Sequence, residues 1–147
     1  MFISCGKSSK DVASSTENDQ NFYFSSREGD LYRIPLIEPI QVISTNGIGS
    51  NWILELPYQQ VKNKKNIEVS SVSIVDSLII VYSKSTYFPG TMTEAWLLIN
   101  TKAKTENVYQ IRSDYENRLT EIGIKEPQLR DVNQLYLEFK QTLKLRW

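Results

Sequence analysis

The clearest pattern of hydrophobic and polar positions lies in residues 69–99. Within residues 71–74, serine alternates with valine and isoleucine, which predicts a strand with one small polar face and one apolar face. Residues 78–83 and 94–100 instead carry runs of four and five consecutive apolar residues. A strand that is apolar on both faces is covered on both faces. We therefore expect these two segments to be the central strands of an antiparallel sheet.

Short polar segments separate these strands. Asp76 and Ser77 are predicted to form a two-residue hairpin turn. Residues 102–105 are predicted to turn into a fourth strand at 107–111. Residues 83–93 have the composition of an irregular loop that is long for a hairpin connection. Other parts of the chain must then cover the two faces of the sheet.

The N-terminal half of the chain predicts further strands. Residues 21–25 and 30–34 look like the two arms of a hairpin, and residues 40–44 alternate between two faces. Residues 52–56 place a tryptophan and two leucines on one face of another strand. Pro35 lacks a backbone N–H, which indicates a position at a sheet edge or at a crossing between sheets.

The last third of the chain changes to a helical period. Ser113 and Glu116 fit a capping box at the start of one helix, and Gly123 fits the position just after its end. Pro127 fits the first turn of a second helix, whose apolar residues recur every three or four positions. The predicted fold class is α+β: an antiparallel β-sheet, or two packed sheets, followed by two C-terminal helices. We expect the helices to cover one face and the N-terminal strands to cover the other.

The composition narrows the chemistry. The chain has 147 residues, no histidine, one cysteine, and 17 basic against 17 acidic residues. An internal disulfide, a Cys/His zinc site and any mechanism that needs imidazole are therefore excluded. A net charge of zero provides no general attraction to nucleic acid. We expect no catalytic residues, no metal ligands, no cofactor and no enzyme activity, and no apolar run is long enough to span a membrane.

Residues 2–6, Phe-Ile-Ser-Cys-Gly, form the most informative short motif. They resemble the cleavage box of bacterial lipoproteins, in which small residues flank a cysteine after an apolar segment. In that family the cysteine is acylated and becomes the new N-terminus. The resemblance implies this role for Cys5, with a lipid anchor on the periplasmic face of a bacterial membrane. It also predicts a translation start further upstream, because a signal peptide needs a basic start and a longer apolar stretch.

Residues 7–20 are polar and rich in serine, which is typical of a flexible tether. We expect residues 1–20 to form this tether and residues 21–147 to form one globular α+β domain. The alternative is an ordinary cytoplasmic tail that contains a free thiol.

Two aromatic residues, Tyr87 and Phe88, lie at the tip of the predicted loop and are followed by Pro-Gly and Thr91. Exposed aromatic residues at a loop tip are typical of a protein-binding hot spot. We expect Tyr87, Phe88 and Thr91 to contact a protein partner. The alternative is that Phe88 folds back over the edge of the sheet.

The lipoprotein-like box, the tether and a small α+β domain without a catalytic set together resemble small bacterial immunity proteins. Residues 32–39, Trp52 and residues 145–147 carry the remaining likeness. The resemblance implies a non-catalytic protein-binding module that sterically neutralises a secreted toxin. Two alternatives stay open: an accessory or structural lipoprotein of a bacterial envelope assembly, and an enzyme or small-ligand binder that uses carboxylates alone.

Overall fold

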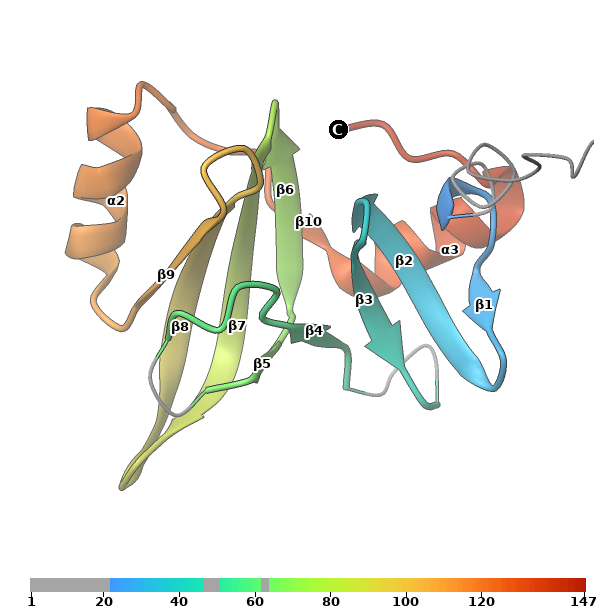
Figure 1. Cartoon of the computed structure of the whole chain (residues 1–147), viewed down its shortest axis with the longest axis horizontal. Helices are drawn as coiled ribbons and strands as arrows, with labels where there is room; N and C mark the ends of the chain where they lie inside the picture. The colour runs from blue at the N-terminus through green and yellow to red at the C-terminus, as the bar shows by residue number, and fades with distance from the viewer. Residues whose placement is uncertain (1–21, 47–50, 62–63) are drawn as a thin grey trace, which may run out of the picture.

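The structure is a computed structural model that describes residues 22–46, 51–61 and 64–147. These residues form two antiparallel sheets of five strands each and two α-helices (Figure 1). The prediction of an α+β fold built on antiparallel sheet is confirmed, in the form of two packed sheets.

The first sheet is a meander, because its strands are neighbours in the order in which they follow along the chain. Its strands are β1 (Arg27–Glu28), β2 (Leu31–Ile37), β3 (Ile40–Ser44), β4 (Ile53–Glu55) and β5 (Asn66–Glu68).

The second sheet has the strand order β10-β6-β7-β8-β9. Its long β7–β8 hairpin dominates, and β10 returns from the last third of the chain to pair with β6. The strands are β6 (Ser71–Val75), β7 (Leu78–Phe88), β8 (Thr91–Asn100), β9 (Thr105–Tyr109) and β10 (Arg130–Asp131).

The chain passes from the first sheet to the second at Val69 and Ser70. The Val69 N–H donates to the carbonyl of Trp52 (2.7 Å), whereas the Ser70 N–H donates to the carbonyl of Tyr82 on β7 (2.9 Å). The Ser70 carbonyl then accepts from the N–H of Val132 (3.1 Å). This crossing therefore links both sheets to the C-terminal third of the chain.

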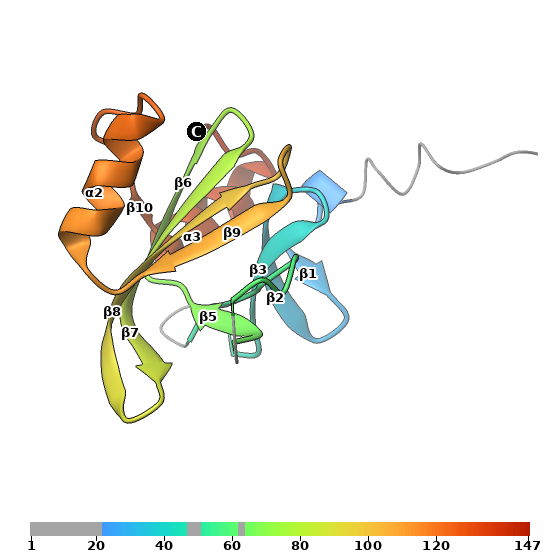
Figure 2. The ribbon, with the colours of Figure 1, turned by 60° about the vertical axis from the view of Figure 1, so that its left-hand side comes forward.

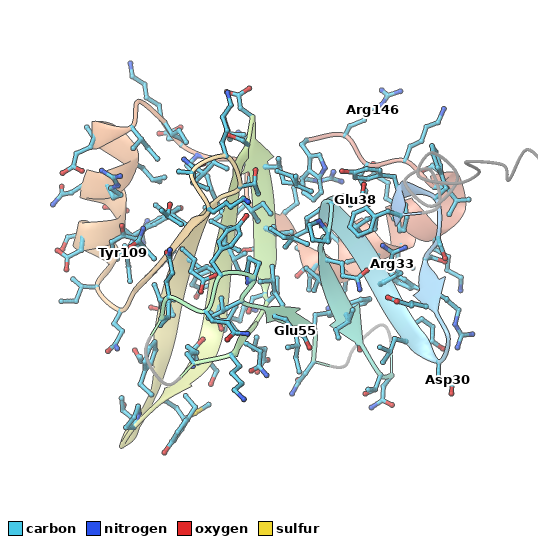
Figure 3. The ribbon with its side chains drawn as sticks, in the orientation of Figure 1. Asp30, Arg33, Glu38, Glu55, Tyr109 and Arg146 are labelled. Atoms are coloured by element: carbon cyan, nitrogen blue, oxygen red, sulfur yellow. The ribbon has the colours of Figure 1, made fainter. Side chains whose placement is uncertain are left out.

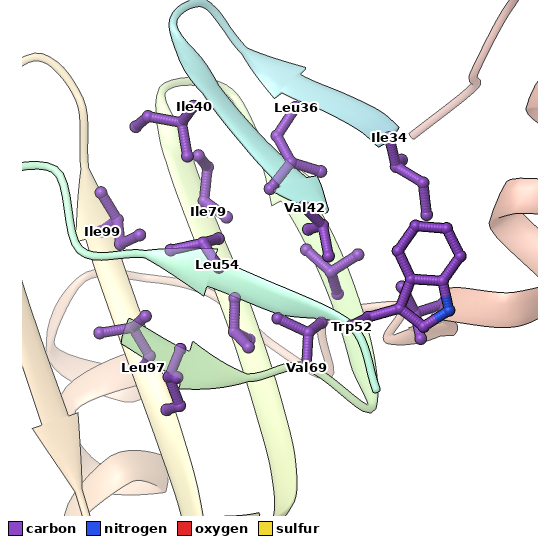
Figure 4. Packing of buried hydrophobic residues seen from close by; sticks show 14 of the residues in the cluster. Ile34, Leu36, Ile40, Val42, Trp52, Leu54, Val69, Ile79, Leu97 and Ile99 are labelled. Carbon is purple, nitrogen blue, oxygen red and sulfur yellow. The ribbon is translucent and has the colours of Figure 1, made fainter. Parts of the chain in front are cut away.

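The two sheets pack over one hydrophobic core (Figure 4). The inward residues alternate with exposed ones along the strands, so that Leu54 is buried between Ile53 and Glu55, which are both exposed. Burial of each large apolar side chain contributes about 1.5–3 kcal/mol. The core residues labelled in Figure 4 are Ile34, Leu36, Ile40, Val42, Trp52, Leu54, Val69, Ile79, Leu97 and Ile99.

The prediction that residues 78–83 and 94–100 are central strands covered on both faces is confirmed. Leu97 and Ile99 lie in the core between the sheets. Trp96, on the opposite face of β8, belongs to a second apolar cluster on the outer face of the sheet.

The prediction of a loop at residues 83–93 is wrong, because β7 and β8 continue almost to its middle. Between Ser83 and Thr86 the β7 strand advances three residues while β8 advances two, which is a bulge. Pro89 and Gly90 form the turn, and Gly90 has φ +85°, a conformation that favours glycine. The bulge hid the strand pattern because it shifts the alternation of side chains by one residue.

Helix α2 (Arg112–Glu121) covers the outer face of the second sheet, where Tyr115 and Leu119 pack against Trp96 (Figure 2). The predicted capping box is wrong: the N-cap is Ile111, with no side-chain cap, and Ser113 lies inside the first turn. The predicted C-terminal glycine is confirmed.

At that C-terminus, Gly123 has φ +78°, and its N–H donates to the carbonyl of Thr120 (3.1 Å). The next N–H, of Ile124, donates to the carbonyl of Leu119 (2.9 Å). This pair of hydrogen bonds is a Schellman motif.

Helix α3 (Val132–Thr142) begins five residues after the predicted Pro127. Residues 130–131 instead pair with β6, and the Asp131 carboxylate caps α3 by accepting from the N–H groups of Asn133 (3.0 Å) and Gln134 (3.1 Å). Val132, Leu135 and Tyr136 of α3 join the core between the sheets. The two helices therefore do not cover the same face, contrary to the prediction.

The first predicted hairpin is only partly confirmed. Strand β2 contains the expected second arm, but the first arm is the two-residue β1, and Phe22 and Tyr23 lie in a helical turn before it. Pro35 lies beyond the end of β1, next to an irregularity in the β2–β3 pairing, as expected for a proline at a sheet edge.

Candidate functional site

The β7–β8 hairpin extends beyond the rest of the protein (Figures 1 and 2). Near its tip, Tyr87 and Met92 lie opposite each other in the strand pairing. Tyr87 is 64% exposed and Met92 is 59% exposed. Among the large hydrophobic residues that the structure describes, only Ile111, also at 59%, is as exposed as Met92. The tip thus presents an aromatic residue and a methionine side by side to solvent.

Phe88 and Thr91, the other two predicted contact residues nearby, differ in environment. Phe88 is half-buried and packs against the main core, so that it folds back onto the protein. The Lys64 ammonium lies 4.7 Å from the Phe88 ring centroid and donates to the Tyr87 carbonyl (2.6 Å). Thr91 is exposed and lies opposite Phe88 in the pairing. Lys64 therefore fixes the end of the hairpin to the segment that precedes β5.

The outer face of β8 continues from the tip toward α2. Because alternate residues share a face, Met92, Glu94 and Trp96 follow one another along it. At its inner end this face becomes the floor of a groove of about 950 Å³. Helix α2 and residues 123–129 form the walls of this groove.

Tyr82 and Glu94 meet at the mouth of the groove. The Tyr82 hydroxyl donates to Glu94 Oε1 (2.5 Å), a short charge-assisted hydrogen bond. This hydrogen bond, together with burial, raises the pKa of Tyr82 above its usual value. Tyr82 thus stays a neutral donor, and Glu94 lies between the groove and the exposed hairpin tip.

Trp96 and Tyr115 form the floor of the groove. Their rings stack with centroids 5.7 Å apart and an angle of 19° between their planes. Burial raises the pKa of Tyr115 to about 12. The Tyr115 hydroxyl is buried and has no hydrogen-bond partner among the described residues, which costs free energy in the folded state.

Charged residues line the rim on the helix side. Arg112 Nε donates to Glu116 Oε1 (2.7 Å), one turn further along α2. Both side chains are well exposed, so this pair adds little stability. The hydrogen bond to Glu116 raises the pKa of Arg112. The rim can therefore exchange partners with an incoming polar group.

Cys5, the predicted lipidation site, lies outside the described residues. Tyr87 and Thr91 lie where a partner can reach them, and their role in binding stays a prediction. Sequence reasoning missed Met92 as a contact residue because residues 83–93 looked like a loop. It also missed the groove, because the pairing of Tyr82 with Trp96 depends on the register of β7 and β8.

The part of the chain that the structure describes contains no group of three or more acidic, cysteine or histidine side chains arranged to hold a metal ion. None of its helices is both long enough and apolar enough to cross a membrane. Comparisons of the chain with protein-family models, with curated proteins and with solved structures found no significant match.

Proposed function

We propose that this chain is a non-catalytic protein-binding module that acts by covering a functional surface of a protein partner. The observation that carries the proposal is the exposed Tyr87–Met92 pair at the end of a protruding hairpin. Tyrosine and methionine are enriched in the centres of protein–protein interfaces, where a few such residues provide most of the binding energy.

The hairpin is held in place before any partner arrives. Lys64 ties its tip to the segment that precedes β5, and Phe88 packs on the core. A preordered contact loses less conformational entropy on binding than a flexible loop does. This supports a role as a rigid projection rather than as a loop that orders on contact.

The groove extends the same surface. Met92, Glu94 and Trp96 lead from the exposed tip to the hollow under α2 along one face of β8. A partner that docks on the tip would place a neighbouring segment over the groove mouth. An interface of standard size buries about 800 Å² per partner, so we expect the partner to cover both the tip and the groove mouth.

Within this class, we propose an immunity-type inhibitor that sterically neutralises a toxin, anchored through a lipid on Cys5. Its support is the resemblance of the N-terminal box and tether to lipoproteins, joined to a domain whose exposed surface suits protein contact. An accessory lipoprotein of an envelope assembly would use the same surface, but its partner would be a permanent component of the envelope.

The test is a quantitative affinity capture from the native host with a C-terminal tag, so that the N-terminal cysteine stays free. Three forms are compared: the wild type, the double variant Tyr87→Ser/Met92→Ser, and the control Leu137→Ser. Leu137 is an exposed hydrophobic residue on α3, in a different part of the fold. Circular dichroism and thermal unfolding first establish that all three forms are folded.

We expect one stoichiometric protein to be captured by the wild type and by Leu137→Ser but to be lost from the hairpin variant. A secreted toxin or hydrolase as that protein supports the inhibitor, and an envelope component supports the accessory lipoprotein. Equal capture by all three forms would contradict the proposal that the hairpin tip binds the partner. If no stoichiometric protein is captured, the binding-module proposal is contradicted. The result would then favour a binder of small ligands in the groove.

A further inference from the structure

Arg33 is a buried cation on β2, at the opposite end of the protein from Tyr109 and α2 (Figure 3). Its residue is only 4% exposed, an unusual position for an arginine. Its Nε donates to Gln41 Oε1 (2.7 Å) and its Nη1 donates to the carbonyl of Ser25 (3.2 Å). The guanidinium also lies 4.7 Å from the centroid of the Phe22 ring.

One nitrogen of this guanidinium has no partner in the part of the chain that the structure describes. Among the described residues, Arg33 Nη2 is buried without a hydrogen bond, and no carboxylate lies within ion-pair distance of Arg33. The carboxylate that acts on it from further away is Glu28, whose Oε2 accepts from Gln41 Nε2 (2.9 Å). Gln41 thus links the arginine to the carboxylate of Glu28 through its own two hydrogen bonds.

The charge of Arg33 is correspondingly poorly compensated. Burial lowers the pKa of its guanidinium, and the more distant charge of Glu28 only partly offsets this. A buried charge is normally paired with an opposite charge that is directly hydrogen-bonded to it. The guanidinium has already lost its hydration in the folded protein. A ligand that brought a negative charge to it would therefore bind without a further desolvation cost for the arginine.

Arg33 also lines an open hollow of about 520 Å³. A second cation, Arg27, lies on its wall with its guanidinium 4.7 Å from the Tyr32 ring centroid. Glu28 and Glu38 line the same hollow, so its four charged side chains sum to zero. Its zero net charge therefore gives the hollow no general attraction for anions. Binding depends on direct contact with the Arg33 guanidinium, whose buried Nη2 a ligand can reach only when the side chains over it move.

We propose that this hollow is a binding site for a single carboxylate group, which accepts a charge-assisted hydrogen bond from Arg33. A planar carboxylate matches the geometry of a guanidinium better than a spherical anion does. Its source is either an acidic side chain or the C-terminus of a peptide, which share this chemistry. The site is separate from the hairpin surface and does not depend on the function proposed for it.

The test is an NMR titration of the full chain that follows the arginine side-chain nitrogen signals. The probes are acetate, a short peptide with a free C-terminus and blocked N-terminus, and a peptide blocked at both ends with one internal aspartate. Chloride keeps the ionic strength constant. We expect saturable shifts of the Arg33 signals with acetate, and the two peptides show which source binds more tightly.

Two variants sharpen the result. Glu28→Gln removes the competing carboxylate and is expected to tighten acetate binding by about fivefold. Arg112→Gln, which removes an exposed arginine on α2, is the control and leaves the affinity unchanged. Non-saturating shifts with every probe overturn the site, and so does an affinity that is the same in Glu28→Gln and in the wild type. Neither variant removes Arg33, so the test does not depend on a form that fails to fold.

Discussion

Glu106 and Gln60 hold each other through reciprocal hydrogen bonds across 46 residues of sequence. Glu106 Oε1 accepts from the Gln60 N–H (2.8 Å), and Gln60 Oε1 accepts from the Glu106 N–H (3.1 Å). Glu106 Oε2 also accepts from the N–H of Tyr58 (3.0 Å). Glu106 lies on β9, an edge strand of the second sheet, so this contact covers an edge that would otherwise be open to another strand.

Replacing the buried Glu106 by alanine is expected to lower the free energy of unfolding by about 2–4 kcal/mol. The change removes two charge-assisted hydrogen bonds and leaves two backbone N–H groups without their acceptor. Urea denaturation measures the loss. Glu55→Ala, at an exposed strand position, is the matched control and is expected to stay within about 0.5 kcal/mol of the wild type. Equal effects of the two variants would contradict the structural role of Glu106.

The fold shows which parts of this arrangement a sequence can predict. Consecutive apolar residues in 94–100 correctly predict a strand covered on both faces, because the rule depends only on where each side chain points. The covers were predicted only in part: the N-terminal strands cover one face and α2 covers the other, as expected, but α3 packs into the core between the sheets. The strands β1 and β10 have two residues each, and β10 is a strand only because Arg130 and Asp131 pair with β6, which lies far away in the sequence.

The candidate site was predictable to a smaller extent. Tyr87 and Phe88 stand out by composition, but only the pairing shows that Tyr87 has Met92 beside it and that Phe88 packs inward. Arg33 looks like the polar position of an alternating strand. Its burial depends on residues 22–25 lying over it, and no local pattern encodes this contact.

Because the pKa of Tyr115 is raised by burial, we expect the protein to lose stability at alkaline pH. Its pKa is about 12 in the folded state and about 10 in an unfolded chain, so the folded state stays protonated up to a higher pH. The contribution of this pKa shift to the free energy of unfolding is therefore fully present below pH 10. It is lost as the pH rises from about 10 to 12, by about 2–3 kcal/mol in total. Urea denaturation between pH 8 and 12, at about half-unit steps, measures this loss.

The variant Tyr115→Phe isolates that contribution. It removes a hydroxyl that has no partner among the described residues, so at pH 7 we expect equal or higher stability than in the wild type. Above pH 10 its stability should fall less steeply, although Tyr82, Tyr109 and Tyr136, whose pKa values are also raised, still contribute. A pH profile parallel to that of the wild type would show that Tyr115 ionises normally in the folded protein.

Ile111 is a poor N-cap for α2 and offers a stabilising substitution. It has the extended backbone that an N-cap needs, φ −111° and ψ 120°, but its side chain cannot accept a hydrogen bond. Ile111→Ser is expected to raise the free energy of unfolding by about 0.5–1 kcal/mol, because the new hydroxyl can accept from a free N–H of the first turn. Chemical denaturation measures the gain. Ile122→Ser, at the other end of the helix, should give no gain.

Lys64 fixes the hairpin tip that we propose as the binding surface, so its replacement tests whether binding needs a rigid tip. Lys64→Met keeps an apolar stem against Phe88 but removes the hydrogen bond to the Tyr87 carbonyl and the cation over the ring. We expect faster amide exchange in residues 86–92 and binding of a captured partner weakened by about three- to tenfold, because the tip must then order on contact. Lys84→Met, an exposed position on the same hairpin, is the control. Faster exchange without weaker binding would mean that the partner does not need a rigid tip, whereas weaker binding without faster exchange would mean that Lys64 contacts the partner itself.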